Sequence, residues 1–327
     1  MAKTLQEYAA WLDERERLWP AAPTPVVPKC TPYLKPLPDV RGVAWSVYGV
    51  LLFISDGKLL HQHPDPLRMQ VALDKTIQEF NMWNSMSRKP GAPWQYMLQQ
   101  YTRIVEDMQL AASPRKGETP EINSAEVWRQ LIERLGKKEY TWDEDLYGDL
   151  EEFSEKVAYF FHSCLQGAGP APGALSALEA VAFGGFNQGA VGDMQCFTMV
   201  QLLRALRTQG AVAQLPDLFS PGCLSASHLK GVRQPARTLF ETCVQQFTRH
   251  GLDPHEILFV GARLKDEVAV AKQLGLRTAL YAGDKLHMQA SHAELQQPEL
   301  RPDRILSDLG QIRQLLGLTS SEPTMAE

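Results

Sequence analysis

Residues 43–52, Val-Ala-Trp-Ser-Val-Tyr-Gly-Val-Leu-Leu, decide the fold of this chain. Residues 42–48 favour strands and are bounded by Arg41 and Gly49, which predicts a fully buried strand. A second apolar run follows the glycine. The stretch therefore predicts a buried strand that ends at a glycine and is followed by a second apolar segment.

Helical and short apolar segments alternate along the second half of the chain. This alternation predicts a parallel sheet that is covered by helices on both faces and joined by right-handed crossovers. In such sheets, ligands bind at the carboxyl ends of the strands. The expected helices are 174–183, 198–208, 236–250, 265–274 and 309–316, and the expected strands lie near 190–191 and at 223–225, 256–261, 277–281 and 304–306.

Between the first strand and this α/β region lies a long polar segment with helical periodicity. Its amphipathic stretches predict helices at 67–80, 94–110, 124–135 and 146–164, separated by prolines and glycines. The glycine- and proline-rich residues 167–173 are expected to form a flexible hinge after the last of them. The tryptophans and methionines of this segment could line an apolar pocket, although ordinary packing between helices explains them better.

The N-terminal 40 residues have a different composition. Residues 4–18 have helical spacing, and the proline-dense residues 20–38 suit neither a helix nor a sheet ladder. We expect this second part to be either an arm across the core surface or a partly disordered leader.

Several segments, in the correct order, resemble the motifs of the haloacid dehalogenase (HAD) superfamily. Residues 43–52 are similar to its first motif, hydrophobic-hydrophobic-Asp-x-Asp-Gly-Thr-Leu. Residues 231–235, Gly-Val-Arg-Gln-Pro, resemble its Gly-x-Arg-Lys-Pro segment, and residues 258–268 resemble its Val-Gly-Asp-x-x-x-x-Asp-Val segment. The resemblance covers about 41–55 and 190–284.

This resemblance implies an α/β fold: a Rossmann-like parallel sheet core with an inserted α-helical cap domain. The domains would then be an N-terminal helix and arm at 1–40, a core at 41–57 and 174–320, a cap at 58–173, and a tail at 321–327.

The resemblance also assigns positions to the family's catalytic groups, and this chain departs from the family at each. Ser46 stands at the aspartate nucleophile and Tyr48 at the acid/base aspartate. Gly192 replaces the hydroxyl residue that holds a phosphoryl oxygen, Gln234 replaces the lysine, and Ala262 replaces an aspartate that binds magnesium.

These substitutions remove the chemistry that the family uses. If residues 42–48 form one strand, Ser46 and Tyr48 point into the same site. A serine is a poor nucleophile without a positioned base, and a tyrosine is a weak base at neutral pH. Magnesium prefers several oxygen ligands, and only Glu267, with Asp193 or Asp266, would remain nearby. We therefore expect no cofactor, or magnesium only if some activity remains.

Three hypotheses for the function follow. The first is a pseudoenzyme that binds a small anionic or phosphorylated ligand, or a protein partner, through a pocket containing Gly192, Asp193, Arg233 and Arg263, with Lys265 at its mouth. The second is a residual or altered hydrolase of small phosphate esters. The third is a structural or assembly role.

Composition excludes other classes of function. The net charge of −5 and the lack of a Lys/Arg stripe argue against nucleic acid binding, and no apolar run is long enough to span a membrane. Five scattered cysteines without a CxxC pair argue against a disulfide framework or a zinc site. The polar N-terminus does not resemble a secretory signal, so we expect a cytoplasmic protein. His61 and His63 are expected to be polar surface residues.

Overall fold

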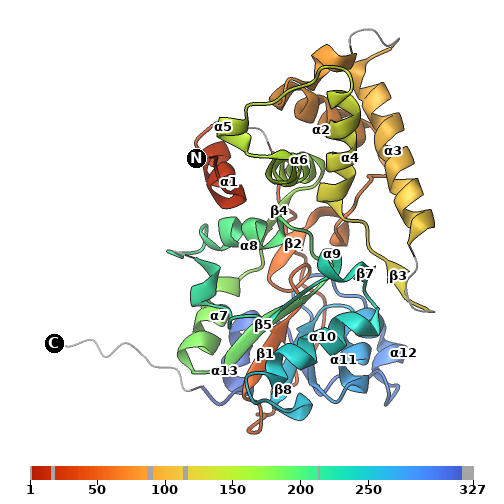
Figure 1. Cartoon of the computed structure of the whole chain (residues 1–327). Coiled ribbons are helices and arrows are strands. Elements are labelled where there is room, and N and C mark those ends of the chain that lie inside the picture. The colour runs from red at the N-terminus through yellow and green to blue at the C-terminus, as the bar shows by residue number, and fades with distance from the viewer. Residues whose placement is uncertain (1, 16–18, 87–90, 113–116, 213, 319–327) are drawn as a thin grey trace, which may run out of the picture.

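The computed structural model describes residues 2–15, 19–86, 91–112, 117–212 and 214–318. Six parallel strands form the central sheet in the order β10-β9-β8-β1-β5-β6 (Figure 1). The strands are β1 (Gly42–Trp45), β5 (Asn187–Gly192), β6 (Leu224–Ala226), β8 (Ile257–Gly261), β9 (Arg277–Tyr281) and β10 (Arg304–Leu306). The predicted α/β fold with a Rossmann-like parallel sheet is confirmed.

Helices cover both faces of this sheet. Alternate residues of β1 point to opposite faces: Ala44 packs with α10 (Arg237–Thr248) and α11 (Ala269–Gln273), while Val43 and Trp45 belong to the core on the other face. That second face is covered by helices α7 (Ala174–Phe183), α8 (Thr198–Leu206) and α13 (Ile312–Leu315). The chain thus buries strands that are apolar on both sides, as parallel sheets require.

A layer of helices lies beyond the carboxyl ends of the strands (Figure 1). Its members are α2 (Pro66–Glu79), α3 (Pro93–Ala111), α4 (Ser124–Gly136), α5 (Glu144–Tyr147) and α6 (Leu150–Leu165). The predicted single helix at 146–164 is two helices, because Gly148 has a positive φ and Asp149 then caps α6. From Phe153 onward, nearly all of α6 is buried, since α2 and α4 pack on it and α1 (Leu5–Asp13) lies beside it. The division into an arm, a core, a cap and a tail at the residues given above remains a prediction.

Short antiparallel pairs link this helical layer to the sheet. Strand β2 (Leu52–Ile54) pairs with β4 (Ala168–Pro170), and β3 (Thr119–Pro120) pairs with β7 (Val232–Arg233). The prediction of a flexible hinge at 167–173 was therefore wrong for its first half, which forms a strand.

The side chain of Gln166 ties the two connections of this layer together. Its amide donates to the carbonyl oxygens of Ser55 and Lys58 and accepts from the backbone of Leu60. The outgoing and returning chains are therefore joined by hydrogen bonds as well as by the β2–β4 pair.

The proline-rich arm lies on the core, which decides between the two alternatives left by the sequence. Tyr33 forms an antiparallel bridge with Ile305 on β10, at the edge of the sheet. Further along the arm, the backbone of Leu37 donates to the carbonyl of Leu315. The arm thus covers an edge strand that would otherwise expose unpaired backbone groups.

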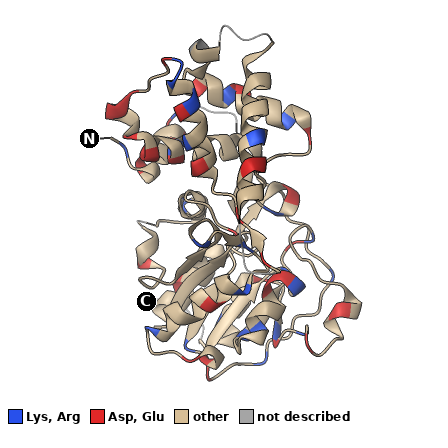
Figure 2. Cartoon of the chain, turned by 45° about the vertical axis from the view of Figure 1, so that its right-hand side comes forward, with Lys and Arg blue, Asp and Glu red and all other residues tan. Residues whose placement is uncertain are grey.

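The remaining elements are short. They are α9 (Ser227–Lys230), α12 (His292–Leu295), a π-helix at Leu264–Val268, and 3-10 helices at Ser55–Gly57, Met82–Met86, Leu215–Asp217, Pro254–Glu256 and Leu309–Gln311. Acidic and basic side chains are interspersed over both the helical layer and the sheet region (Figure 2). None of the helices that the structure describes has the length and apolar character needed to cross a bilayer. The predicted tail at 321–327 lies outside the described residues.

Candidate functional site

Four of the five motif positions meet at the carboxyl edge of the sheet. Ser46 follows β1, Gly192 ends β5, and Ala262 follows β8, and these three strands are neighbours. Gln234 follows β7 and joins them because its backbone N–H donates to Asp193 Oδ1 at 2.7 Å. The sequence order of the motifs therefore becomes one cluster in space, where parallel sheets bind ligands.

Glu267 is the central carboxylate of this cluster and is fully buried. Its Oε1 accepts from Ser46 Oγ at 2.8 Å and from the guanidinium of Arg263 at 2.9 and 3.2 Å. Its Oε2 accepts from the backbone N–H groups of Ala262 and Arg263 at 2.8 and 2.9 Å. Five donors from the protein thus occupy the lone pairs of this carboxylate.

The guanidinium of Arg263 lies between two carboxylates. It contacts Glu267, lies 3.8 Å from Asp193 Oδ2, and donates to Gln234 Oε1. Burial disfavours its charge, but Glu267 and Asp193 outweigh burial and raise the pKa of Arg263. At Asp193, in contrast, burial is the larger effect: it raises the pKa of the carboxyl, although the charges of Arg263 and Arg233 oppose it. Arg263 therefore lies in the predicted pocket, where it is a largely buried partner in an ion pair.

The other predicted basic residues are more exposed and are also paired. Arg233 is 29% exposed and lies 3.5 Å from Asp193 Oδ2. Lys265 is turned outward and pairs with Glu294 at 2.6 Å. Two arginines thus face two buried carboxylates, so the site is nearly balanced in charge. Asp266 is half-buried, and Glu267, the other weak metal candidate, is the residue that reaches the site.

Gln234 carries an unused donor in this cluster. Its Oε1 accepts from Arg263, but its Nε2 is buried and has no hydrogen-bond partner among the described residues. Gly192 leaves room in front of it, since a Cβ on Gly192 would lie 3.2 Å from that nitrogen. A buried amide without a partner costs free energy, so this donor is suited to an acceptor atom of a bound molecule.

Tyr48 does not share a site with Ser46, contrary to the prediction. Strand β1 ends at Trp45, and the following residues form a turn in which Leu51 and Leu52 donate to the carbonyl of Val47. The Tyr48 hydroxyl instead donates to Gln201 Oε1 at 2.7 Å and pairs with Thr198 at 3.1 Å, both on α8. Burial raises the pKa of this phenol, so it stays neutral and serves as a hydrogen-bonding group.

Magnesium does not fit the residues that surround Glu267. Both carboxylate oxygens are already held by protein donors, and a guanidinium lies where a second cation would have to approach. Ala262 and Gly192 supply no side-chain oxygen. The described residues contain no group of three or more His, Cys, Asp or Glu side chains that could hold a metal ion.

A polar junction between the helical layer and the core was missed from the sequence. His61 bonds with Glu121 Oε1 and with Ser124 Oγ, both at 3.1 Å, and Ser124 also bonds with His162 at 2.9 Å. Glu121 in turn accepts from Ser227 at 2.5 Å. The prediction that His61 is a polar surface residue was wrong. The cluster joins residues that are far apart in the sequence, so no local sequence pattern could have predicted it.

His63 was also predicted to lie at the surface, and this was wrong as well. It is buried against Asp56, with 3.3 Å between His63 Nε2 and Asp56 Oδ2. Both histidines therefore stabilise the connection that leads from the sheet to the helical layer.

Comparisons with known proteins agree with this architecture. A family model described as HAD-hydrolase-like matches residues 231–312. The chain is similar to a 2-haloacid dehalogenase from Pseudomonas syringae pv. Tomato DC3000, with a TM-score of 0.51 and 17% identity over 85% of this chain and 98% of that chain. No curated protein matches it.

Two other solved structures are similar at lower TM-scores. A HAD phosphatase from Thermococcus onnurineus has a TM-score of 0.45 and 15% identity over 85% of this chain and 98% of that chain. A HAD-hydrolase from Bacillus subtilis, bound to magnesium, has a TM-score of 0.42 and 16% identity over the same shares. The parallel sheet and the fold shared with the dehalogenase show a HAD-like α/β fold, and the match to the family model lies in the C-terminal part of that fold.

Proposed function

We propose that this HAD-like protein does not transfer phosphoryl groups by the family's route and instead acts by binding a small ligand or a protein partner. The position of Arg263 carries this proposal. Its guanidinium is held between Glu267 and Asp193, so a positive charge of the protein itself neutralises the carboxylates that a metal would need. A pocket that is already balanced in this way has no use for a divalent cation.

The substitutions at the other motif positions support the same conclusion. Loss of one preorganised electrostatic group typically lowers a rate by about 10² to 10³, and loss of an acid/base group by about 10² to 10⁴. These factors do not multiply, because removing one group of a cooperating set already removes most of the rate enhancement that the other groups provide. Ser46 is 2% exposed, which also keeps its hydroxyl away from a substrate.

A small ligand with a hydrogen-bond acceptor suits the donor of Gln234. The unpartnered Nε2 and the partly exposed guanidinium of Arg233 are the groups that would meet an anion such as phosphate. The balanced charges around them favour a weakly charged ligand over a multiply charged one. Titration calorimetry with inorganic phosphate tests this version: we expect weak heat that Gln234→Leu abolishes.

A turnover assay tests the proposal as a whole. With para-nitrophenyl phosphate and magnesium, we expect no turnover from the native chain. The matched variant restores the family's nucleophile, lysine and metal-binding aspartate with Ser46→Asp, Gln234→Lys and Ala262→Asp, and removes the internal cation with Arg263→Ser. Any activity should appear only in this variant, provided that its circular dichroism shows a folded chain. Equal activity in both would contradict the proposal.

The hydrogen bond from Ser46 to Glu267 favours a second candidate function. In a residual or altered hydrolase, Glu267 would take the proton of Ser46 as it attacks a phosphate ester. Comparing the native chain with Ser46→Ala distinguishes the hydrolase from the binding role. Turnover by the native chain that disappears in Ser46→Ala would support the hydrolase and rule out the binding role. An assembly role is tested by light scattering during size-exclusion chromatography, where a monomer without a copurifying protein counts against it.

A further inference from the structure

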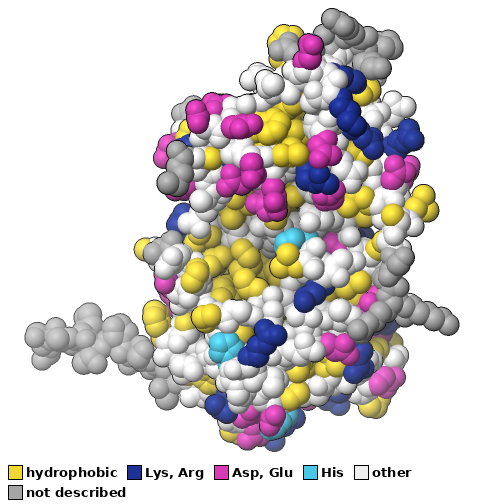
Figure 3. All heavy atoms as spheres, viewed as in Figure 1, with side chains coloured by type: hydrophobic (Ala, Val, Ile, Leu, Met, Phe, Trp, Pro, Cys, Tyr) yellow, Lys and Arg dark blue, Asp and Glu magenta, His cyan; other side chains and the backbone are white. Residues whose placement is uncertain are grey.

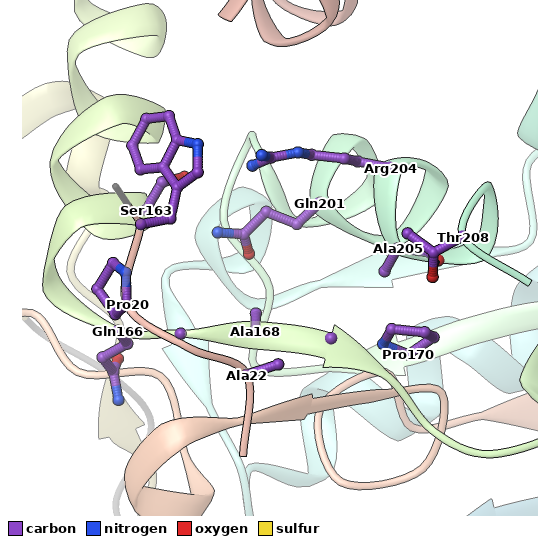
Figure 4. A pocket seen from close by; sticks show the side chains of 13 residues that line it. Pro20, Ala22, Ser163, Gln166, Ala168, Pro170, Gln201, Arg204, Ala205 and Thr208 are labelled. Atoms are coloured by element: carbon purple, nitrogen blue, oxygen red, sulfur yellow. The ribbon is translucent and has the colours of Figure 1, made fainter. Parts of the chain in front are cut away.

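A pocket of about 350 Å³ lies where the arm, the helical layer and the core meet. The arm contributes Trp19, Pro20 and Ala22, and the end of α6 with β4 forms a second wall. Helix α8 forms the third wall with Gln201 and Arg204, as the close view shows (Figure 4). The residues around Glu267 do not line it, so this pocket is distinct from the site described above.

Glycines allow the arm to form its wall. A Cβ on Gly167 would lie 1.9 Å from the carbonyl oxygen of Ala21, and one on Gly169 would lie 2.7 Å from Ala22. Only residues without a side chain at these positions let the arm approach β4 so closely. The wall is therefore built into the fold.

Gln201 presents a fixed donor to this pocket. Its Oε1 accepts from the Tyr48 hydroxyl, which sets the orientation of the amide, and its nitrogen points across the cavity toward α6 (Figure 4). The residue is 8% exposed, so this donor has few alternatives to a molecule inside the pocket. The tyrosine at the family's acid/base position thus orients a residue of a different pocket.

Arg204 supplies a positive charge beside Gln201. The two residues are three apart on α8 and therefore lie on the same face of the helix. The guanidinium of Arg204 packs over the Trp19 ring at 5.5 Å, donates to Tyr159, and pairs with Asp13. Because Asp13 offsets part of this charge, the pocket suits a singly charged acid.

We propose that this pocket binds a small, planar, mostly apolar molecule that carries one carboxylate. The carboxylate would accept from Gln201 Nε2 and Arg204, and the apolar body would lie among Pro20, Ala22, Ala168 and Ala205. A dry cavity of about 150 Å³ holds one benzene ring. A pocket of about 350 Å³ therefore has room for two fused rings and a head group.

A second hollow shows by contrast what makes this pocket a binding site. It measures about 430 Å³ and lies beside α8 and the segment after it, where hydrophobic side chains gather on the surface (Figure 3). Met199, Leu203, Leu215, Phe219 and Leu224 line it. Its polar lining residues are Gln6 and Ser220, and its lining includes no charged side chain that could hold a ligand as Arg204 does.

The experiment uses the full chain labelled with ¹⁵N and three probes of one shape. Naphthalene carboxylate should bind with a Kd below about 1 mM. Its neutral amide should bind more weakly, and naphthylmethylamine should not bind because its cation faces Arg204. The side-chain amide signal of Gln201, identified by its absence in Gln201→Glu, should shift on binding and so place the probe in this pocket.

A matched pair of variants separates a role in binding from a role in folding. Arg204→Met and Asp13→Asn remove the same ion pair, yet the first removes the cation and the second releases it. We expect Arg204→Met to weaken binding of the carboxylate at least about tenfold and Asp13→Asn to strengthen it by about threefold. Gln201→Glu keeps the acceptor for Tyr48 and should abolish binding.

Three results would overturn the proposal. They are the absence of binding by any probe at about 10 mM, equal affinities for the carboxylate in the two charge variants, and binding that leaves the Gln201 signal unchanged. Thermal unfolding of each variant establishes that the chain is folded. The outcome is independent of the turnover assay, since neither Arg204 nor Asp13 belongs to the cluster around Glu267.

Discussion

At the scale of single residues, Arg263 is the side chain on which the proposed metal-independent role rests. It neutralises Glu267 and Asp193 from within the fold, and it holds the amide of Gln234. Helical spacing does not account for its pair with Glu267, because Arg263 has an extended backbone and precedes the π-helix at Leu264–Val268. The sequence placed Arg263 and Asp193 in one pocket, but it could not show that their side chains form an ion pair, because Asp193 follows a different strand.

Removal of this guanidinium should destabilise the chain strongly. Arg263→Met leaves the fully buried Glu267 without its cation, and breaking a buried ion pair by removing one partner typically costs about 3–5 kcal/mol. The measurement is the free energy of unfolding in urea. The control is Lys265→Ala, which breaks an exposed ion pair with Glu294 and should change stability little. Equal effects of the two substitutions would show that Arg263 is not a structural cation.

Tyr48 marks the limit of prediction from a strand pattern. Alternation along a strand assigned its side chain to the face of Ser46, and this failed because β1 ends three residues earlier. An apolar run does not show where a strand stops when the chain after it is equally apolar. The turn that redirects Tyr48 depends on Gly49, whose positive φ suits glycine and brings the backbone close to His287 and Ala262.

At the scale of elements, the long helices and central strands follow from local sequence. Residues 174–183 and 277–281 have the predicted bounds because their apolar periodicity is continuous. Strands β2 and β4 were not predicted. Strand β2 (Leu-Phe-Ile) is a three-residue part of a longer apolar run, and β4 (Ala-Gly-Pro) has no strand signal of its own. They form only because the chain returns from the helical layer beside its point of departure.

The polar junction between the layer and the core should make stability depend on pH. Burial lowers the pKa of His162 well below its ordinary value of 6.5, and the nearby His61 adds to the effect. The folded state therefore binds fewer protons than the unfolded state, and stability is complete above about pH 6.5 and falls below it. Burial opposes ionisation of Glu121, but His61 and Ser227 lower its pKa overall, so a further loss follows in more acidic solution.

Thermal unfolding between about pH 7.5 and pH 5.5 tests this expectation. The midpoint should fall with pH in the native chain, and the slope should be smaller in His162→Leu, which has no group to protonate. The exposed His255 provides the control, because His255→Gln should keep the native slope. A slope unchanged by His162→Leu would assign the pH dependence to other groups.

At the scale of the whole molecule, the arm joins parts of the core that are distant in sequence. The backbone of Val26 donates to the buried carboxylate of Asp284 at 2.7 Å and accepts from Lys285 at 2.8 Å. The many prolines in residues 20–38 excluded a helix and the interior of a sheet. The sequence could not show where on the core the arm binds. That depends on a carboxylate more than 250 residues away.

A single proline tests the arm's attachment. Val26→Pro removes the donor to Asp284 and should lower the free energy of unfolding by about 1–3 kcal/mol, the usual cost of a buried acceptor that loses its partner. Val27→Pro is the matched control, because Val27 is equally exposed and lies in the same proline-rich stretch. Urea unfolding of both variants measures the difference. Loss of stability in both would point to the backbone instead of this bond.

The bridge between Tyr33 and Ile305 has a practical consequence for anyone shortening this protein. A fragment that begins at β1 would contain all the segments that resemble family motifs. It would nevertheless leave the outer strand of the sheet, β10, without its covering arm. Bare margins of this kind recruit strands from other molecules and lead to insoluble material. Expression and crystallisation trials should therefore begin upstream of the proline-rich stretch.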